Sequence, residues 1–404
     1  MSSVRRKKLG KLLATEKKVE KKGGVWLVKS EHDNNTKYEV KNGLGGFFCT
    51  CPDYTEHEKP CKHIYAVQEV IKAKKTGRKL RPLKSLVIPR PTYPQHWVTY
   101  NKAQAEEKER MEKLLKELCL GLPERERKPG RPHARMKDIV FAATMKVYGT
   151  LSGRRSSTDL KVCQEKAFIK KVPHYNTISK YLNDQELTPI LQNLIRECAK
   201  SLIKAESVFA IDSTGVATFD ISRWFDEKFG QAAHQRDWLK LHISIGINTH
   251  IIAGLTITDS NVNDATQFRL LVEETAKTFN IKEVLADKAY LGTKAFEVVE
   301  MHGARAYIPF KKNSTGAASS ILKRNFDYYK KHRRMHQKHY SQRNNVEAAM
   351  RMIKSKFSES IRSKNDTSRI NEILCKLLCH NLVVLVHHQA KYATELDFWN
   401  NEVA

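Results

Sequence analysis

The sequence HYSQRNNVEAAMRMIKSKF, at residues 339–357, contains no Gly or Pro and repeats apolar residues at helical spacing. At about 100° per residue, Tyr340, Arg343, Glu347 and Lys354 fall within an arc roughly 60° wide. The apolar side chains fill the neighbouring arc, which predicts an amphipathic helix with one packing face. By periodicity alone, the polar strip is typical of a solvated helix edge. Carboxylates elsewhere in the chain decide whether Glu347 has partners.

Two apolar runs outside this helix end in aspartate. Residues 208–211 (VFAI) lead into Asp212, and residues 284–286 (VLA) lead into Asp287. Each run predicts a buried strand that delivers a carboxylate at its C-terminal end, where α/β sheets place their sites. Capping of a following helix is the alternative role, and it suits Asp287 better than Asp212. Hard oxygen ligands of this kind are what Mg²⁺ or Mn²⁺ requires in two-metal phosphoryl transfer.

The pattern around these runs predicts an α/β domain with a mixed sheet and flanking helices. The expected strands lie at 208–211, 239–247, 251–257, 284–286 and 304–309. One helix is expected to begin at about Ala265, a second to span 295–301 and a third to span 371–385.

These residues resemble a known family. The order Asp212, Asp287 and Glu347, with Ser-Thr after the first aspartate and Tyr-x2-Arg-x3-Glu-x6-Lys on the last helix, is similar to DDE transposases of insertion sequences carrying the Tyr-Arg-Glu-Lys signature. The resemblance covers about residues 208–388. It implies an RNase H-like fold and a two-Mg²⁺ site formed by the three carboxylates. It also implies contacts to phosphates of the transposon end, which a guanidinium and an ammonium suit, from Tyr340, Arg343 and Lys354.

The segment between the second aspartate and the glutamate departs from that family. Members often carry a long β-rich insertion there, whereas 347 − 287 leaves 60 positions in this chain. Much of the segment reads as basic loop, including KKHRR at 330–334. Hairpin-forming chemistry on the flanking strand is therefore not carried over.

A second motif, near the N-terminus, offers softer ligands. Cys49 and Cys51 are followed, after nine intervening residues, by Cys61 and His63 at the start of an apolar helix. Thiolates and imidazole are the donors that tetrahedral Zn²⁺ prefers, although His57 in the intervening loop could compete. The spacing resembles the SWIM-type zinc finger and covers residues 25–75, beginning with a hairpin. The expected role is structural, with contact to DNA or protein as a possible addition.

Composition limits the class of protein. The 404 residues include 72 Lys and Arg against 44 Asp and Glu, a formal charge of +28 that predicts a polyanionic partner such as nucleic acid. The sequence contains neither a secretory signal nor a long apolar run typical of a membrane span. Eight scattered cysteines predict a reducing compartment. We therefore expect a cytoplasmic, nucleoid-associated protein that is not secreted and does not bind membranes.

Shifts in composition predict five regions. The charged helix predicted at about 101–120 could pack on the body or pair with a second copy. Residues 176–182 suit either a helix-turn-helix-like DNA reader or a structural bundle. The expected order is a basic disordered tail at 1–24, the zinc finger at 25–75, a Pro-rich linker and charged helix at 76–127, a helical DNA-binding region at 128–205 that begins with a basic turn, and an RNase H-like catalytic domain at 206–395.

Three weaker candidates remain. Trp238, Lys240 and His242 alternate along a predicted strand, and their face could meet DNA or belong to a structural strand. Asp264 is expected to cap a helix, with a substrate-facing role as the alternative. Core packing rather than metal binding is expected for Cys375, Cys379 and His380.

Together these observations predict a transposase that binds double-stranded DNA at the ends of its element. It would cleave with Mg²⁺-activated water and join the freed 3′-hydroxyl to target DNA. Cutting two ends requires two active sites, so at least a dimer on DNA is expected. The alternatives are a DNA-binding regulator derived from such an enzyme and a structure-specific nuclease of the same fold.

Overall fold

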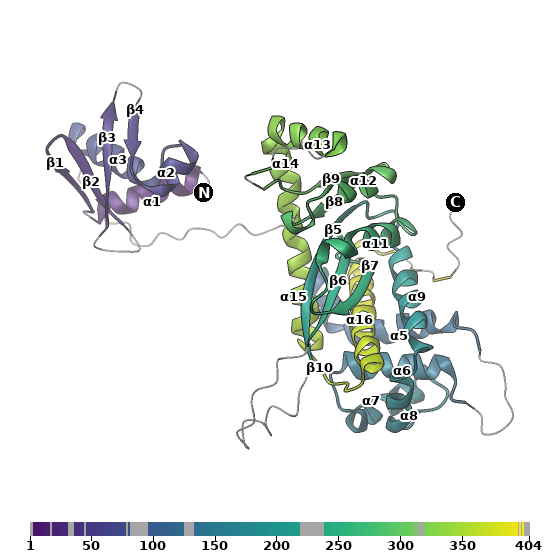
Figure 1. Cartoon of the computed structure of the whole chain (residues 1–404). Coiled ribbons are helices and arrows are strands. Elements are labelled where there is room, and N and C mark those ends of the chain that lie inside the picture. The colour runs from purple at the N-terminus through teal and green to yellow at the C-terminus, as the bar shows by residue number, and fades with distance from the viewer. Residues whose placement is uncertain are drawn as a thin grey trace, which may run out of the picture. The chain divides into compact units, whose positions relative to one another are not determined.

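The chain forms two compact units, Met1–Pro94 and Gln95–Ala404, in the computed structural model (Figure 1). The structure describes residues 3–16, 18–30, 36–43, 46–77, 80, 96–124, 133–218, 238–311, 313–314, 319–394, 396 and 398–399. The Pro-rich part of the expected linker, 81–95, and the expected basic turn at 128–132 lie outside these residues.

The first unit is an antiparallel sheet with helices. The expected hairpin is confirmed, because Trp26 lies opposite Val40 and Val28 lies opposite Tyr38. Val28, Val40 and Ile64 are fully or almost fully buried in one core. The elements are α1 (Ser3–Thr15), β1 (Val19–Lys22), β2 (Val25–Lys29), β3 (Lys37–Gly43), β4 (Gly46–Cys49), α2 (Pro52–His57) and α3 (Lys62–Lys75), with the strands paired in chain order.

The expectation of a disordered tail over residues 1–24 is wrong, because α1 and β1 belong to this unit. α1 packs against α3 so closely that a Cβ on Gly10 would lie 2.5 Å from the Cβ of Tyr65. Leu13 is fully buried. The Arg6 guanidinium donates to both carboxylate oxygens of Asp53, at 2.9 and 2.6 Å. A narrow apolar stripe and one buried ion pair therefore order a segment that its lysine content alone would leave unfolded.

A mixed sheet forms the centre of the second unit. Its main path runs β7-β6-β5-β8-β9, with β5 antiparallel to β6, β6 antiparallel to β7, and β8 parallel to both β5 and β9. This is the expected RNase H-like arrangement. The strands are β5 (Val208–Thr218), β6 (Trp238–Gly246), β7 (Ile252–Asp259), β8 (Glu283–Ala286) and β9 (Arg305–Tyr307).

β5 is longer than the sequence predicted, so Asp212 lies within the strand rather than at its end. β8 stops at Ala286, which pairs with Ile211. Off this path, β10 (Ser360–Ile361) pairs in parallel with β5, but only from Ala217 onward. Among the described residues, β5 is therefore paired with β6 but has no second strand partner over 212–216. This interruption opens the sheet next to Asp212.

The long helix α16 (Asp366–Tyr392) organises the helical part of the second unit (Figure 1). By length and composition α16 could cross a membrane, but 78% of its apolar window is buried inside the protein. The expected core packing of Cys375, Cys379 and His380 is confirmed. The helices that contact α16 include α4 (Trp97–Ala105), α5 (Glu107–Leu120), α6 (Met136–Tyr148), α8 (Tyr175–Leu182) and α9 (Leu187–Lys200).

The charged helix left open by the sequence packs on the body of this unit. Met111 and Leu115 of α5 are fully buried in the same hydrophobic core as the mixed sheet. The sequence pattern predicts four or five helices between residues 135 and 205, and the structure has α6, α7 (Gly153–Glu165), α8 and α9 there. Asn176 and Lys180 of α8 are exposed, whereas Ile178 is buried. This pattern suits a DNA-reading helix and a bundle helix alike.

Helices replace the basic loop expected before Glu347. α13 (Ser320–Lys331) and α14 (Arg333–Tyr340) fill that segment, and a 3-10 turn, η2 (Ser341–Arg343), leads into α15 (Asn344–Phe357). The single helix predicted for 339–357 is thus divided at η2. The remaining elements are α11 (Asp264–Ala276), a 3-10 turn η1 (Lys288–Tyr290) and α12 (Thr293–Met301).

Candidate functional site

Asp212 lies within β5, and Asp287 directly follows β8, the parallel strand beside it. Because Ile211 pairs with Ala286, each aspartate follows a buried residue at the same level of the sheet. The Asp212 Oδ1 accepts from the backbone N–H of Ser213 at 2.9 Å, and the Asp287 Oδ1 accepts from that of Lys288 at 2.6 Å. The second bond makes Asp287 the N-cap of η1. Backbone bonds thus orient both carboxylates and leave each a second oxygen for another partner.

Glu347 reaches Asp212 through one guanidinium. Arg343 Nη1 donates to Asp212 Oδ2 at 2.6 Å, and Arg343 Nη2 donates to Glu347 Oε1 at 2.6 Å. Arg343, expected on a DNA phosphate, thus bridges a strand carboxylate and a helix carboxylate. Asp212, Asp287 and Glu347 are not among the described groups whose ligand atoms are close enough to share an ion.

Charge explains why an arginine lies at this position. Burial raises the pKa of Asp212 above its usual range, the Ser213 amide and Arg343 oppose this shift, and the nearby carboxylate of Asp287 adds to it. Burial alone would lower the pKa of Arg343. The surrounding acidic groups, chiefly Asp212, outweigh burial, so the pKa of Arg343 is raised. Carboxylates this close repel one another unless a cation lies among them. Their hard oxygens, on an open face of the sheet, fit a divalent ion such as Mg²⁺.

An open cleft extends from the carboxylates along α15. Lys354, predicted from its helical position, lines this cleft and lies 3.8 Å from Glu359. Arg351 also lines it, although the sequence interpretation did not include that residue. Its position one turn after Glu347 was the available signal, because residues four apart share a helix face. The cleft is lined by Asp212, Ser213, Thr214, Glu347, Met350, Arg351, Lys354, Ser355 and Glu359.

Tyr340 lies at the end of α14, near the same carboxylates. Burial raises the pKa of its phenol, Arg343 opposes the shift, and Asp287 and Asp212 add to it. The phenol is therefore neutral at ordinary pH and retains a proton to donate.

Asp264 has a different role from the expected cap. Asn263 is the N-cap of α11, since its side chain accepts from the Ala265 N–H. The carboxylate of Asp264 instead lies 2.6 Å from Lys240 Nζ and 3.5 Å from His242 Nδ1 on β6. Lys240 and His242 of β6 therefore face the carboxylate of Asp264 within the protein.

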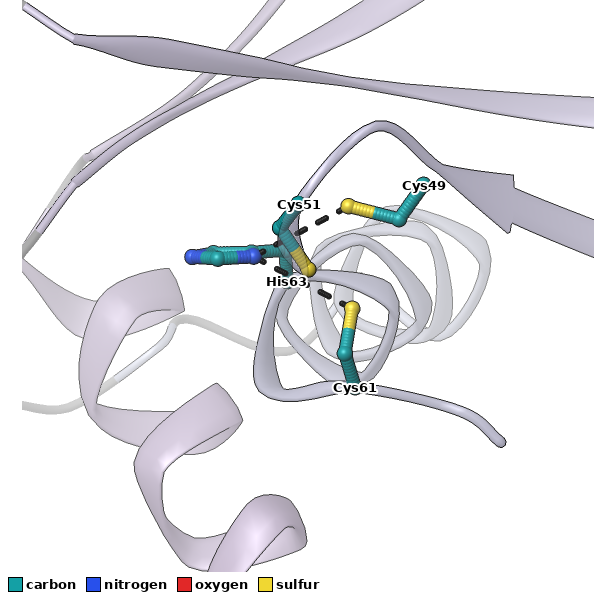
Figure 2. A group of neighbouring side chains, drawn as sticks. All are labelled: Cys49, Cys51, Cys61 and His63. Carbon is teal, nitrogen blue, oxygen red and sulfur yellow. Dashed lines mark hydrogen bonds between the residues drawn. The ribbon is translucent and has the colours of Figure 1, made fainter. Parts of the chain in front are cut away.

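The thiol and imidazole ligands of the first unit form a compact cluster (Figure 2). The ligand atoms of Cys49, Cys51, Cys61 and His63 all lie within 4.8 Å of one another and are buried. His63 Nδ1 is 3.8 Å from Cys49 Sγ and 3.9 Å from Cys61 Sγ. Donors of a tetrahedral site with Zn–S bonds of 2.3 Å lie roughly 3.8 Å apart. The cluster therefore fits structural Zn²⁺, and the exposed His57 is outside it.

Helix ends favour thiolates in this cluster. Cys51 is the N-cap of α2 and Cys61 is the N-cap of α3, so both sulfurs lie at the positive ends of helix dipoles. Hydrogen bonds from the other two cysteine thiols hold the pKa of Cys51 well below its usual range. Deprotonated sulfur is the form that binds zinc.

A buried carboxylate supports α15 from behind. Glu107 of α5 accepts from Lys356 Nζ of α15 and, at 2.7 Å, from the Tyr148 hydroxyl of α6, and His387 of α16 is 3.9 Å away. Burial raises the pKa of Glu107, but His387, Lys356 and Tyr148 together lower it to about 2. Four helices thus meet at this ion pair. A glutamate within the apolar face of a predicted helix was the only sequence signal for it.

Comparison with protein families identifies two regions of the chain. Residues 203–382 match the model of the transposase DDE domain, and residues 38–71 match the model of the SWIM zinc finger. The first match contains Asp212, Asp287 and Glu347, and the second contains all four zinc-type ligands. The chain therefore carries an RNase H-like transposase DDE domain together with an N-terminal SWIM zinc finger.

Proposed function

We propose that this protein is a transposase that cleaves DNA at the ends of its element and joins the freed 3′-hydroxyl to target DNA. The observation that supports it most is the convergence of Asp212 and Glu347, 135 positions apart (347 − 212), at an opening of the sheet beside Asp287. The family match adds the expectation that DNA is the substrate.

Asp212, Asp287 and Glu347 are the residues that would hold the catalytic ions. Divalent metal bound there supplies an activated water or 3′-hydroxyl and neutralises charge on the phosphate in transit. The backbone bonds from Ser213 and Lys288 keep the aspartates oriented without using their second oxygens. Catalysis then rests mainly on positioning and electrostatic stabilisation.

Tyr340, Arg343 and Lys354 would hold the DNA phosphates next to the scissile bond. Lys354 lines the cleft that contains Asp212 and Glu347, which supports this role. Arg343 would leave the carboxylates and pair with a phosphate when DNA and metal enter together. Its fork of donors suits a phosphate as well as a carboxylate.

Recognition of element ends would come from the helical region. α8 exposes Asn176 and Lys180 at polar positions of a short helix, which supports base or phosphate contacts there. We further infer at least a dimer on DNA, since two ends must be cut, and action on DNA in the cytoplasm. The SWIM finger would add affinity for DNA or for a partner protein.

One assay tests the proposal against its alternatives. Purified full-length protein is incubated with labelled element ends, Mg²⁺ and a target plasmid. Joined products would support transposition, cuts without joining would favour a structure-specific nuclease, and binding without cutting would favour a DNA-binding regulator. Asp212→Ala should remove cleavage and spare binding, and cleavage retained by this variant would refute the metal assignment.

A further inference from the structure

Helices α13 and α14 form a strongly basic surface that the proposed chemistry does not use. Residues 320–340 contain seven Lys or Arg and one Asp. Arg333, Arg334 and Lys338 are exposed, and no ion pair joins any of them to another described residue. Charges that find no internal partner remain available to an external anion.

Aromatic packing fixes this surface to the sheet. Tyr307 of β9 stacks on His339 of α14 with ring centroids 4.6 Å apart, and Tyr329 of α13 meets His336 of α14 edge-on at 4.8 Å. Burial lowers the pKa of His336 to about 4, so this histidine is a neutral packing residue at pH 7. The exposed basic residues are therefore displayed from a supported pair of helices rather than from a loop.

The basic surface continues onto the edge of the sheet. The Arg305 guanidinium of β9 stacks over the Tyr328 ring of α13 at 4.4 Å. Both residues line a groove between α12, β9 and α13, together with Arg324. Arg324 is paired with Glu300, so it adds little net charge.

The same surface leads directly into the polar strip formed by Tyr340, Arg343, Glu347 and Lys354. Tyr340, Ser341, Arg343 and Asn344 all have right-handed helical backbone angles, so α14, the 3-10 turn η2 and α15 form one continuous helical path (Figure 1). Along such a path, Arg334 and Glu347 are separated by about 20 Å at 1.5 Å per residue. At 3.4 Å per base pair, that distance corresponds to roughly six base pairs of duplex DNA.

We propose that α13 and α14 bind the phosphate backbone of the duplex about six base pairs from the phosphate that the carboxylates act on, using Arg333, Arg334 and Lys338. The proposal rests on the proposed function for the position of the scissile phosphate. These three residues are exposed and positively charged, and their helix continues into the polar strip that contains Glu347. This arrangement favours DNA over an acidic protein segment.

Salt dependence of DNA binding tests this surface. Affinities of full-length protein for a 40-base-pair duplex are measured by fluorescence anisotropy in Ca²⁺ over a series of salt concentrations. The slope of log K against log salt is negative, and each lost phosphate contact makes it less negative by about 0.9. We expect the triple variant R333A/R334A/K338A to have a slope that is less negative by roughly 2 to 3. Between 50 and 200 mM salt, wild type should then lose roughly 40-fold more affinity than the variant.

The matched control removes three exposed charges elsewhere in the unit, in the variant K204A/R269A/K277A. An unchanged slope in the α13–α14 variant, or an equal change in the control, would overturn the proposal. Hydroxyl-radical footprints on an element end give the position, and the triple variant should lose protection centred about six base pairs from the cut. A variant that changes self-association but keeps the slope would also refute it. If wild type cuts no DNA but the slope difference persists, the proposed function fails and this surface stands.

Discussion

The two candidate metal centres of this protein are built from ligands of opposite character. In the SWIM finger, four buried thiol and imidazole groups come from residues 49–63 and lie within 4.8 Å of one another. In the DDE domain, three carboxylates come from β5, the end of β8 and α15, and Arg343 lies between two of them. One thiolate, at Cys51, can gather with thiols and an imidazole without a counter-ion, whereas three carboxylates need a cation among them. The first centre is suited to stabilising the fold of the finger. The second is suited to releasing the Arg343 guanidinium when metal and DNA bind.

The largest expected effect concerns the thiol and imidazole centre of the finger. Zinc binding in small fingers contributes on the order of 10 kcal/mol to folding. Cys61→Ala should therefore unfold the first unit, with zinc content measured by atomic spectroscopy and protease sensitivity of residues 3–77 measured by mass spectrometry. His57→Ala, at an exposed histidine outside the cluster, is the control and should keep both zinc and protection. A zinc-loaded, protease-resistant Cys61→Ala protein would show that the cluster does not hold the unit together.

The second prediction concerns Asp287 in the carboxylate centre. Asp287→Asn should lower the cleavage rate by at least about 10³-fold, since metal-ion positioning supplies several kcal/mol. DNA affinity should change less than about twofold, because Asp287→Asn removes no cation that neutralises a phosphate. Asp259→Asn, at an exposed aspartate ending β7, provides the control. A comparable loss in the control, or cleavage retained by Asp287→Asn, would contradict the assignment.

The third prediction concerns the support of α15. The pKa of Glu107 is lowered to about 2, so its charge stabilises the fold above the unfolded pKa, and that stability is lost as pH falls from about 4.5 towards 2. Glu107→Gln should destabilise the second unit at pH 7 by about 3 kcal/mol, because Lys356 and Tyr148 lose their anionic partner. Denaturant unfolding at pH 7 and pH 3 measures the difference, which should shrink at the lower pH. A difference that stays constant with pH would mean that the Glu107 charge is not responsible.

The smallest effect tests whether Arg343 competes with metal. Replacing Arg343 by Gln removes two charge-assisted hydrogen bonds from the carboxylates, each worth about 1.5 to 3 kcal/mol before the change in repulsion is counted. We expect Arg343→Gln to bind Mn²⁺ roughly tenfold more tightly than wild type in the absence of DNA, as measured by titration calorimetry. Arg369→Gln, in a residue at the start of α16, is a control of equal charge change. Weaker Mn²⁺ binding by Arg343→Gln would show that the guanidinium supports the metal site rather than competing for it.

Local patterns in the sequence predicted much of this architecture. The strand order, the hairpin of the finger and the zinc ligands follow from alternation and from short ligand spacings. The apolar runs before Asp212 and Asp287 predicted the two strands that bring these residues together. Helical spacing likewise predicted that Glu347 and Lys354 share one face of the helix, and both line the cleft.

What the sequence did not predict depends on contacts between distant segments. The order of α1 depends on the pair of Arg6 with Asp53, 47 positions away. The length of β5 depends on pairing with β6 and β10, which no local pattern shows. The bridge from Arg343 to Asp212 joins residues 131 positions apart, and helical periodicity says only that Arg343 is on the polar strip. The basic run at 330–334 was interpreted as loop because its anchoring aromatic contacts lie on β9 and α14.

A change of metal preference tests most directly whether the carboxylate centre holds the catalytic ion. Replacing Asp212 by Cys introduces a softer ligand, which discriminates against Mg²⁺ and favours Mn²⁺. Cleavage of labelled element ends is measured for wild type and Asp212→Cys in each ion. The account predicts that wild type cuts in both ions and that Asp212→Cys cuts in Mn²⁺ but not in Mg²⁺. Cleavage by Asp212→Cys in Mg²⁺ at the wild-type rate would contradict a metal site at this position.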